Sequence, residues 1–320
     1  MIIKNHFTSV DDVADLTALL AEVTLEKRKK SSMNLFRHKT VGLLFLNPSL
    51  RTRFSTIKAA QNLGAQTISV NMGQGGWALE TSDGVVMDGG KPEHIKEAAG
   101  VLSAYLDVLA VRSFPELKDR DADYADEFIN QLRKYATIPV LSMESATLHP
   151  LQSLTDLFTI QERWKKSQKP KVVLTWAPHI KPLPQSVPNS FAQWMNKADV
   201  DFHITHPEGF ELAEKFVGNA NIEYNQQKAL ENADFVYVKN WSSYQKYGVI
   251  GKGLDDWMIS QNSLKKAPNA NVMHCLPVRR NVVIADDVLD SKQSIVIEQA
   301  ANRVPAAQAV LKLLLEGSHQ

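Results

Sequence analysis

The sequence predicts an α/β protein of two lobes, each built on a central parallel sheet flanked by helices. Short apolar runs alternate with segments of helical period along the chain, which is typical of right-handed βαβ units. Nine strand-like runs are many for one sheet in 320 residues. We therefore expect two lobes of similar size, over residues 1–148 and 149–298, with a C-terminal helix at 299–320 that packs back on the first lobe.

The expected elements follow one another in a regular order. The strands are short apolar runs at 41–46, 67–71, 107–111, 138–142, 171–175, 200–205, 234–238, 271–274 and 294–297. The helices lie between them, at 12–28, 51–63, 92–104, 122–135, 150–164, 187–197, 226–231 and 299–315. Ligands of such folds bind at the carboxyl ends of strands, so polar motifs at these ends are the candidates for a site.

The composition excludes several classes of protein. An apolar content of 44% over 320 residues is enough for two cores, and a net charge of +1 gives no reason to expect nucleic acid as the partner. The single cysteine, Cys275, excludes an intramolecular disulfide and fits a reducing compartment. We see neither a signal-peptide core nor an apolar run of 18 residues, so a cytoplasmic protein without a membrane segment is expected.

The stretch FLNPSLRTRFSTIKAAQNLG (45–64) places anion-binding groups at a strand-to-helix turn. Ser49 can cap the helix, and the backbone N–H groups of Leu50, Arg51 and Thr52 then point out of its first turn, where they carry partial positive charge. Such a turn binds phosphate, and Arg51 adds a bidentate donor. The alternative is an ordinary capped helix with solvated arginines. The glycine-rich segment 73–80 lacks the spacing of dinucleotide and P-loop sites, which counts against a nicotinamide-dependent dehydrogenase.

Four stretches in order resemble the aspartate and ornithine carbamoyltransferases. They are SLRTRFS (49–55), HPLQSLTDL (149–157), MHCLPVRR (273–280) and AANR (300–303), and the resemblance covers nearly the whole chain. It implies a carbamoyl-phosphate-binding domain over 1–148, an amino-acid-binding domain over 149–298, and a homotrimer whose active sites are shared between subunits. It implies no cofactor. The histidines at 94, 203, 206 and 274 lack a metal-like spacing, and no metal site is assigned.

The resemblance also implies a role for each matching residue. The catalytic set would be Arg51, Arg112, His149 and Gln152. Arg112 and His149 would donate to the carbonyl oxygen of carbamoyl phosphate, and Gln152 would bind its NH2 group. The full carbamoyl-phosphate-binding set would be Ser49, Leu50, Arg51, Thr52, Trp77 of a neighbouring subunit, Arg112, His149, Gln152, the backbone carbonyls of Cys275 and Leu276, and Arg303.

Several of these residues could also have a purely structural role. Arg112 could be a surface arginine, His149 a helix cap beside Pro150, and Trp77 a core indole. Most lone cysteines are inert, so we expect no thiol catalysis at Cys275.

One segment departs from the ornithine enzymes. Those carry an Asp-x-x-x-Ser-Met-Gly loop for the free α-amino group, whereas 239–248 here reads KNWSSYQKYG. Lys239 would repel an α-ammonium group but pair with an α-carboxylate, so an acylated substrate is expected. The stretches at 76–80, 142–152 and 175–190 resemble the acylornithine branch, in which Glu144 would face the amine end of the substrate.

Pro92 and the cationic residues favour a succinyl group on that substrate. Enzymes for N-acetylornithine carry a glutamate where this chain has Pro92, and a lysine that is missing after Arg280 here. A glutamate would repel the succinyl carboxylate, and His179, Lys239 and Arg279 offer donors for two carboxylates.

The sequence thus predicts transfer of the carbamoyl group from carbamoyl phosphate to the side-chain amine of N2-succinyl-L-ornithine, in arginine biosynthesis. The alternatives are the same reaction on N2-acetylornithine and a non-catalytic paralogue that binds carbamoyl phosphate.

Overall fold

The computed structural model describes residues 1–29 and 35–317. It divides into two compact units, which we describe separately. Unit 1 consists of Met1–Pro115, Asp121–Leu151 and Arg303–Gln320, and unit 2 of Glu116–Arg120 and Gln152–Asn302. None of the described helices is long and apolar enough to cross a bilayer.

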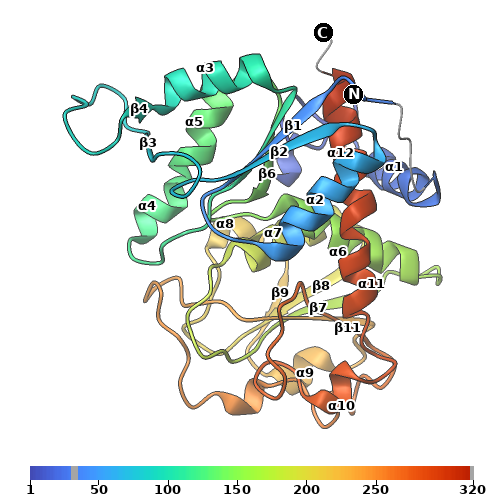
Figure 1. The fold of residues 1–320 in the computed structure, drawn as a ribbon. Helices are drawn as coiled ribbons and strands as arrows, with labels where there is room; N and C mark the ends of the chain where they lie inside the picture. Colours follow the sequence, from blue (N-terminus) through green and yellow to red (C-terminus); the bar gives the residue numbers. More distant parts are fainter. Residues whose placement is uncertain (30–34, 318–320) are drawn as a thin grey trace. The chain divides into compact units, whose positions relative to one another are not determined.

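Unit 1 is built on a four-stranded parallel sheet of order β2-β1-β5-β6. Its strands are β1 (Thr40–Phe45), β2 (Gln66–Asn71), β5 (Val108–Arg112) and β6 (Val140–Glu144). Helices α3 (Ile95–Tyr105) and α5 (Glu127–Tyr135) pack together on one side of the sheet (Figure 1). On the other side, α12 (Arg303–Gly317) packs against α1 (Leu16–Lys29) and α2 (Leu50–Asn62). Strands β5 and β6 are buried throughout, as expected where helices cover both faces.

A long excursion interrupts unit 1 between β2 and α3. It carries the short parallel pair β3 (Leu79–Glu80) and β4 (Glu93–His94), and residues 82–92 between these strands are exposed. Figure 1 shows this excursion as an open loop. The remaining elements of the unit are the 3-10 helix η1 (Val10–Asp12) and the short helix α4 (Arg120–Ala125).

Unit 2 is built on a five-stranded parallel sheet of order β11-β10-β7-β8-β9. Its strands are β7 (Lys171–Trp176), β8 (Asp201–Thr205), β9 (Asn221–Glu223), β10 (Phe235–Lys239) and β11 (Asn271–Met273). The helical elements are α6 (Pro150–Arg163), α7 (Ser186–Lys197), α8 (Glu214–Val217), α9 (Gln226–Leu230), η2 (Asp255–Trp257), α10 (Asp286–Leu289) and α11 (Val296–Ala301). The inner strands β7 and β10 are buried almost throughout and supply the centre of the core.

Most expected elements are found within four residues of their predicted ends, with four differences. The strand expected at 294–297 is wrong, because this run opens helix α11, with Val296 buried and Ile297 74% exposed. A run of four apolar residues does not distinguish a strand from a helix. The helix expected at 122–135 is broken at Asp126, where φ is 46°, and the helix expected at 299–315 is broken at Asn302. The edge strand β9 was not predicted.

Candidate functional site

The turn between β1 and α2 presents the free end of a helix. Ser49 occupies the N-cap position with extended backbone (φ −151°), as predicted, but its side chain makes no capping hydrogen bond. The first N–H groups of this 13-residue helix lack intrahelical partners, so they form a region of positive potential. Leu50 is exposed, Arg51 is half-buried and Thr52 is buried. The structure therefore places the N-terminus of α2 where the sequence predicted it, and phosphate binding at this turn stays a prediction.

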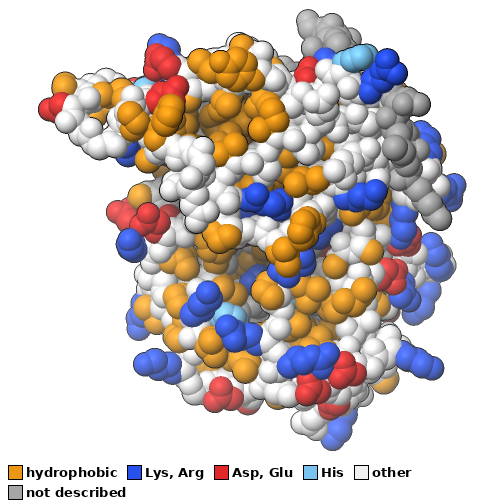
Figure 2. Space-filling view, in the orientation of Figure 1, with side chains coloured by type: hydrophobic (Ala, Val, Ile, Leu, Met, Phe, Trp, Pro, Cys, Tyr) orange, Lys and Arg blue, Asp and Glu red, His pale blue; other side chains and the backbone are white. Residues whose placement is uncertain are grey.

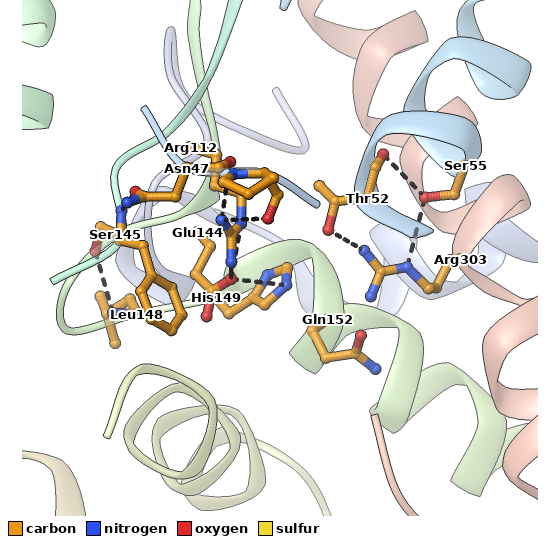
Figure 3. Close-up of polar contacts among 12 residues, drawn as sticks. Asn47, Thr52, Ser55, Arg112, Glu144, Ser145, Leu148, His149, Gln152 and Arg303 are labelled. Atoms are coloured by element: carbon orange, nitrogen blue, oxygen red, sulfur yellow. Dashed lines mark hydrogen bonds and ion pairs between the residues drawn. The ribbon is translucent and has the colours of Figure 1, made fainter. Parts of the chain in front are cut away.

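Arg303 brings a second guanidinium group to the same turn. It is the first residue of α12 and is 8% exposed. Its Nη2 donates to Thr52 Oγ1 over 2.8 Å and its Nε to Ser55 Oγ over 3.4 Å (Figure 3). The packing of α12 on α2 explains how a residue 251 positions away reaches this turn.

Arg53 lies in the same helical turn but points elsewhere. Its guanidinium group lies 4.2 Å from the centroid of the Phe45 ring and donates to Asn71 on β2. This arginine therefore contacts residues of the sheet in unit 1.

A buried ion pair joins the carboxyl ends of two neighbouring strands. Arg112 ends β5 and Glu144 ends β6, and the parallel register places them opposite each other. Glu144 Oε2 accepts from Arg112 Nε over 3.1 Å and lies 3.0 Å from Nη2. Nη1 of the same guanidinium donates to the carbonyls of Asn47 (3.1 Å) and Pro48 (3.2 Å) (Figure 3). Arg112 is 8% exposed, so its reading as a surface arginine is wrong.

His149 lies beside this pair, immediately before helix α6. Its Nε2 is 4.0 Å from Glu144 Oε2, and its Nδ1 has no hydrogen-bond partner among the described residues. Burial lowers the pKa of His149 to about 3, with Arg303 and Arg112 acting in the same direction and Glu144 opposing them. The imidazole is therefore neutral at physiological pH.

The loop that carries Glu144 and His149 is held by the half-buried carboxylate of Asp126. Asp126 accepts from Ser145 Oγ over 2.9 Å, from the backbone N–H of Ala146 over 2.8 Å, and from Thr147 Oγ1. Ser145 N–H also donates to the Leu148 carbonyl over 2.8 Å. These bonds leave the loop little freedom, so the imidazole has a defined position.

The neutral His149 predicts a specific pH dependence of stability. Below pH 6.5 the unfolded histidine binds a proton that the folded one does not, until the pH approaches 3, so acid favours unfolding. Wild type should therefore lose about 1.4 kcal/mol more free energy of unfolding between pH 7.5 and 5.5 than the His149→Gln variant. Urea denaturation at the two pH values measures this difference. Parallel pH dependences in the two proteins would contradict a buried neutral imidazole.

Unit 2 places the remaining predicted groups in two sets. In the first set, Gln152 lies in helix α6, 1% exposed, and Cys275 and Leu276 follow strand β11 in a turn. Leu276 has φ 57°, a left-handed conformation that is uncommon for a branched residue and often marks functional sites.

The second set gathers positive charge. Lys239 ends β10, is 7% exposed, and donates to the Asn240 carbonyl over 3.0 Å. Burial lowers the pKa of His179, as do the nearby charges of Lys239, Arg279 and Lys181, while a hydrogen bond to the Lys181 carbonyl opposes them. The charges of Lys239 and Arg279 thus act on the pKa of His179, so the three residues proposed for carboxylate binding lie near one another in unit 2.

Trp77 and Pro92 both lie on the exposed excursion of unit 1. The Trp77 side chain is 58% exposed, so its reading as a core indole is wrong. Its Nε1 donates to Glu93 Oε2 over 2.7 Å, which ties one end of the excursion to the other. Pro92, adjacent to Glu93, is exposed and available to a ligand or a second chain.

Sequence reasoning missed two features of this arrangement. It gave Glu144 a role at the substrate amine without its partner Arg112, although both side chains were expected near strand ends. It also missed Asp156, which accepts from Gln152 Nε2 over 2.7 Å. The i, i+4 spacing of Gln152 and Asp156 in a predicted helix was a signal that they face each other.

Comparison with known proteins identifies relatives over the whole chain. Residues 3–162 match the model of the aspartate/ornithine carbamoyltransferase carbamoyl-P binding domain, and residues 184–314 match that of the Asp/Orn binding domain. The chain is 54% identical to N-succinylornithine carbamoyltransferase of Bacteroides thetaiotaomicron, covering 97% of this chain and 98% of that protein. It is 33% identical to N-acetylornithine carbamoyltransferase of Xanthomonas campestris pv. campestris, covering 97% of each.

Solved structures of acylornithine transcarbamylases also match nearly the whole chain. Acetylornithine transcarbamylase complexed with acetylcitrulline gives a TM-score of 0.90 at 32% identity, covering 97% of this chain and 98% of that one. A glutamate-to-proline mutant of N-acetyl-L-ornithine transcarbamylase, complexed with carbamyl phosphate and N-succinyl-L-norvaline, gives a TM-score of 0.90 at 33% identity, covering 97% and 99%.

Proposed function

Because the chain belongs to the aspartate/ornithine carbamoyltransferase family, we propose that it transfers the carbamoyl group of carbamoyl phosphate to the side-chain amine of N2-succinyl-L-ornithine. The products are N2-succinyl-L-citrulline and phosphate, and the reaction belongs to arginine biosynthesis. The observation that carries the proposal is the full-length identity to N-succinylornithine carbamoyltransferases, which is much higher than that to the N-acetylornithine enzymes.

The chemistry explains the kinds of residues in the two units. The neutral amine attacks the carbonyl carbon, a new C–N bond forms, and the C–O bond to phosphate breaks. The amine nitrogen gives up a proton, which the departing phosphate can accept. Negative charge grows on the carbonyl oxygen and on the phosphate in the transition state. Fixed donors aimed at both oxygens therefore supply most of the catalysis.

The phosphate group fits the turn at the start of α2. The backbone N–H groups of residues 50–52 and the Arg51 guanidinium would hold it, with Ser49 at the cap. Arg303 is held against Thr52 and adds positive charge at the same turn. Arg51 is only half-buried, so its guanidinium has room to approach a phosphate oxygen.

The carbonyl oxygen fits Arg112 and His149. A guanidinium carries five N–H donors, and four of those of Arg112 are directed at Glu144, Asn47 and Pro48. The second Nη2 hydrogen would then serve the developing oxyanion. The neutral His149 would donate to it from one ring nitrogen, and its low pKa keeps it from acting as a general acid at physiological pH.

The carbamoyl NH2 group needs acceptors, which unit 2 supplies. The Gln152 side-chain oxygen and the backbone carbonyls of Cys275 and Leu276 would accept its two hydrogens. Cys275 then acts through its backbone, and the thiol has no chemical role.

The substrate amino acid fits the cationic set. Lys239, His179 and Arg279 would bind its α-carboxylate and succinyl carboxylate, and Lys239 takes the place of a group that would hold a free α-amino group. Glu144 would face the amine end, with its own charge balanced by Arg112.

The enzyme would work as a homotrimer in the cytoplasm. Unit 1 has an apolar surface around a hollow of about 340 Å³, lined by residues that include Ile68, Val101, Tyr105 and Trp77. Ile68, Val101 and Tyr105 are 52%, 46% and 70% exposed, and Figure 2 shows apolar side chains gathered on this face. A second copy of the chain would cover this surface, and Trp77 would then complete the neighbour's site.

A direct assay tests the proposed activity. The purified enzyme is given carbamoyl phosphate with N2-succinylornithine or N2-acetylornithine, and each citrulline derivative is quantified by mass spectrometry. We expect kcat/KM to be higher for the succinyl substrate. A preference for N2-acetylornithine would overturn the succinyl assignment, and no transfer to either substrate would support a non-catalytic protein.

The Pro92→Glu variant is expected to shift this preference toward N2-acetylornithine. A carboxylate within about 4–6 Å of the succinyl carboxylate costs on the order of 1–3 kcal/mol, so kcat/KM for the succinyl substrate should fall about 5- to 150-fold. The solved glutamate-to-proline mutant, which holds a succinyl ligand, shows the reverse change at a glutamate of a relative. Steady-state kinetics with both substrates measure the effect.

The control for this prediction is Pro92→Gln. Glutamine has the shape of glutamate without its charge, so it removes the proline and adds no repulsion. The succinyl preference should survive in Pro92→Gln and be lost in Pro92→Glu. An unchanged ratio of the two kcat/KM values in Pro92→Glu would mean that position 92 does not read the acyl group.

A further inference from the structure

We propose that Asp156 is a positioning residue that sets the orientation of the whole carbamoyl-NH2 recognition set, namely the Gln152 side chain and the turn of residues 274–276. The inference rests on the proposed function of Gln152, Cys275 and Leu276. It adds a residue that touches no substrate but sets the orientation of the groups that contact the carbamoyl NH2.

Asp156 lies at the centre of a buried chain of hydrogen bonds within unit 2. Its side chain is 0% exposed, in the middle of helix α6. One oxygen, Oδ1, accepts two hydrogen bonds, from Gln152 Nε2 over 2.7 Å and from Gln299 Nε2 over 2.6 Å. Both glutamines are 1% exposed, so these bonds form away from solvent, where each one matters more.

The chain of hydrogen bonds continues from Gln299 to the turn after β11. Gln299 Oε1 accepts from the backbone N–H of His274 over 2.9 Å. The ring of His274 then accepts at Nδ1 from the backbone N–H of Leu276 over 2.8 Å. Two backbone N–H groups of the turn are thereby fixed. The Leu276 N–H shares a peptide plane with the Cys275 carbonyl, so the direction of that carbonyl is fixed with it.

The chemistry of a carboxylate explains why the two glutamine amides adopt one orientation and not the flipped one. An ionised carboxylate only accepts hydrogen bonds, whereas an amide side chain can donate or accept depending on how it is flipped. Against Asp156, each glutamine must present its nitrogen. Gln152 then turns its oxygen the other way, as a group that binds NH2 must. Gln299 likewise turns its oxygen toward the His274 N–H, which needs an acceptor.

Tyr237 completes the surroundings of this carboxylate. Its side chain is 0% exposed on β10, close to Asp156 and Cys275. Burial, together with these two neighbours, raises the pKa of the Tyr237 hydroxyl well above its usual value, so it remains a neutral O–H group.

The test uses two stable ligands that differ only in the recognised group. Phosphonoacetamide carries the NH2 group of carbamoyl phosphate, and acetonylphosphonate has a methyl group in its place. Titration calorimetry on the full-length enzyme gives the affinity ratio of the two. A site built around NH2 hydrogen bonds rejects the methyl analogue, so wild type should prefer phosphonoacetamide by about tenfold or more.

Asp156→Asn is expected to reduce this preference to near unity while the affinity for acetonylphosphonate stays unchanged. The new amide has one acceptor oxygen, and its NH2 group allows either glutamine to flip. The misplaced groups should also lower kcat/KM for carbamoyl phosphate by about 10- to 100-fold. Methionine has a volume similar to that of glutamine but cannot connect Asp156 to His274, so Gln299→Met should lower the preference for phosphonoacetamide in part. If Asp156→Asn does not fold, Gln299→Met alone tests the positioning role.

The matched control is Thr159→Val. Thr159 is also 0% exposed, lies one turn further along α6, and accepts from Asn302 Nδ2 over 3.0 Å, outside this chain. Its loss should lower stability and leave the ligand preference intact.

Gln152→Ala separates the inference from the proposed function. If Gln152→Ala loses the preference and both Asp156→Asn and Gln299→Met keep it, the positioning role of Asp156 is overturned. If wild type shows no preference, NH2 recognition by Gln152 is overturned, and the inference with it.

Discussion

Replacing Arg51 by alanine is expected to lower kcat/KM by about 30- to 1000-fold while the fold survives. The guanidinium would make a charge-assisted hydrogen bond to the phosphate as it leaves, and one such donor contributes roughly 2–4 kcal/mol to the transition state. Arg51 is half-buried in the first turn of α2, so its loss should cost little stability. Steady-state kinetics and a thermal melt separate the two effects.

Arg53→Ala is the matched control for this experiment. It removes an arginine from the same helical turn, but this one contacts Phe45 and Asn71. We expect a somewhat lower melting temperature and kcat/KM near the wild-type value. Near-normal turnover in a folded Arg51→Ala enzyme would exclude the start of α2 as the phosphate site.

The second large effect concerns the proposed sharing of sites between subunits. Trp77→Ala should be nearly inactive if this indole completes the site of a neighbour. The side chain is 58% exposed in the single chain, so the substitution should leave the fold intact. Loss of activity alone would not reveal which subunit uses the indole, and a mixing experiment is therefore needed.

Mixed trimers of Trp77→Ala and Arg51→Ala chains should regain activity. In a cyclic trimer that contains both chains, one of the three sites combines an intact Arg51 with an intact neighbouring Trp77. Random reassociation of equal amounts should therefore restore about a quarter of wild-type activity. Arg112→Ala would be a poorer partner, because it leaves the buried carboxylate of Glu144 without its guanidinium.

The composition of the mixed trimers is verified by native mass spectrometry, and each mutant reassociated with itself is the control. Verified mixed trimers that remain inactive would mean that every site is built within one chain.

Much of the fold could be predicted because hydrophobic patterns act locally. The buried strands β1, β5, β7 and β10 are continuous apolar runs, and each was expected within a residue of its position. The predictions failed where the local signal is weak. The apolar run at 294–297 is too short to distinguish a strand from a helix, and the left-handed break at Asp126 depends on bonds to Ser145 and Thr147.

The sequence by itself determined where the candidate site residues lie along the chain. The turn after β1, the arginine that ends β5, the histidine before α6 and the turn after β11 all stand at carboxyl ends of strands or starts of helices. Local rules of capping and strand ends place such groups, because they depend on neighbouring residues only.

Only the tertiary structure decided how these groups are held. It set Arg303 against Thr52, paired Arg112 with Glu144, buried His149 so that its imidazole is neutral, and joined Gln152, Asp156 and Gln299 in one chain of hydrogen bonds. Most of these contacts join residues far apart in the sequence, and their strength comes from removal of water around them. Both the distance between partners and the loss of solvent are consequences of packing, which no local pattern of residues contains.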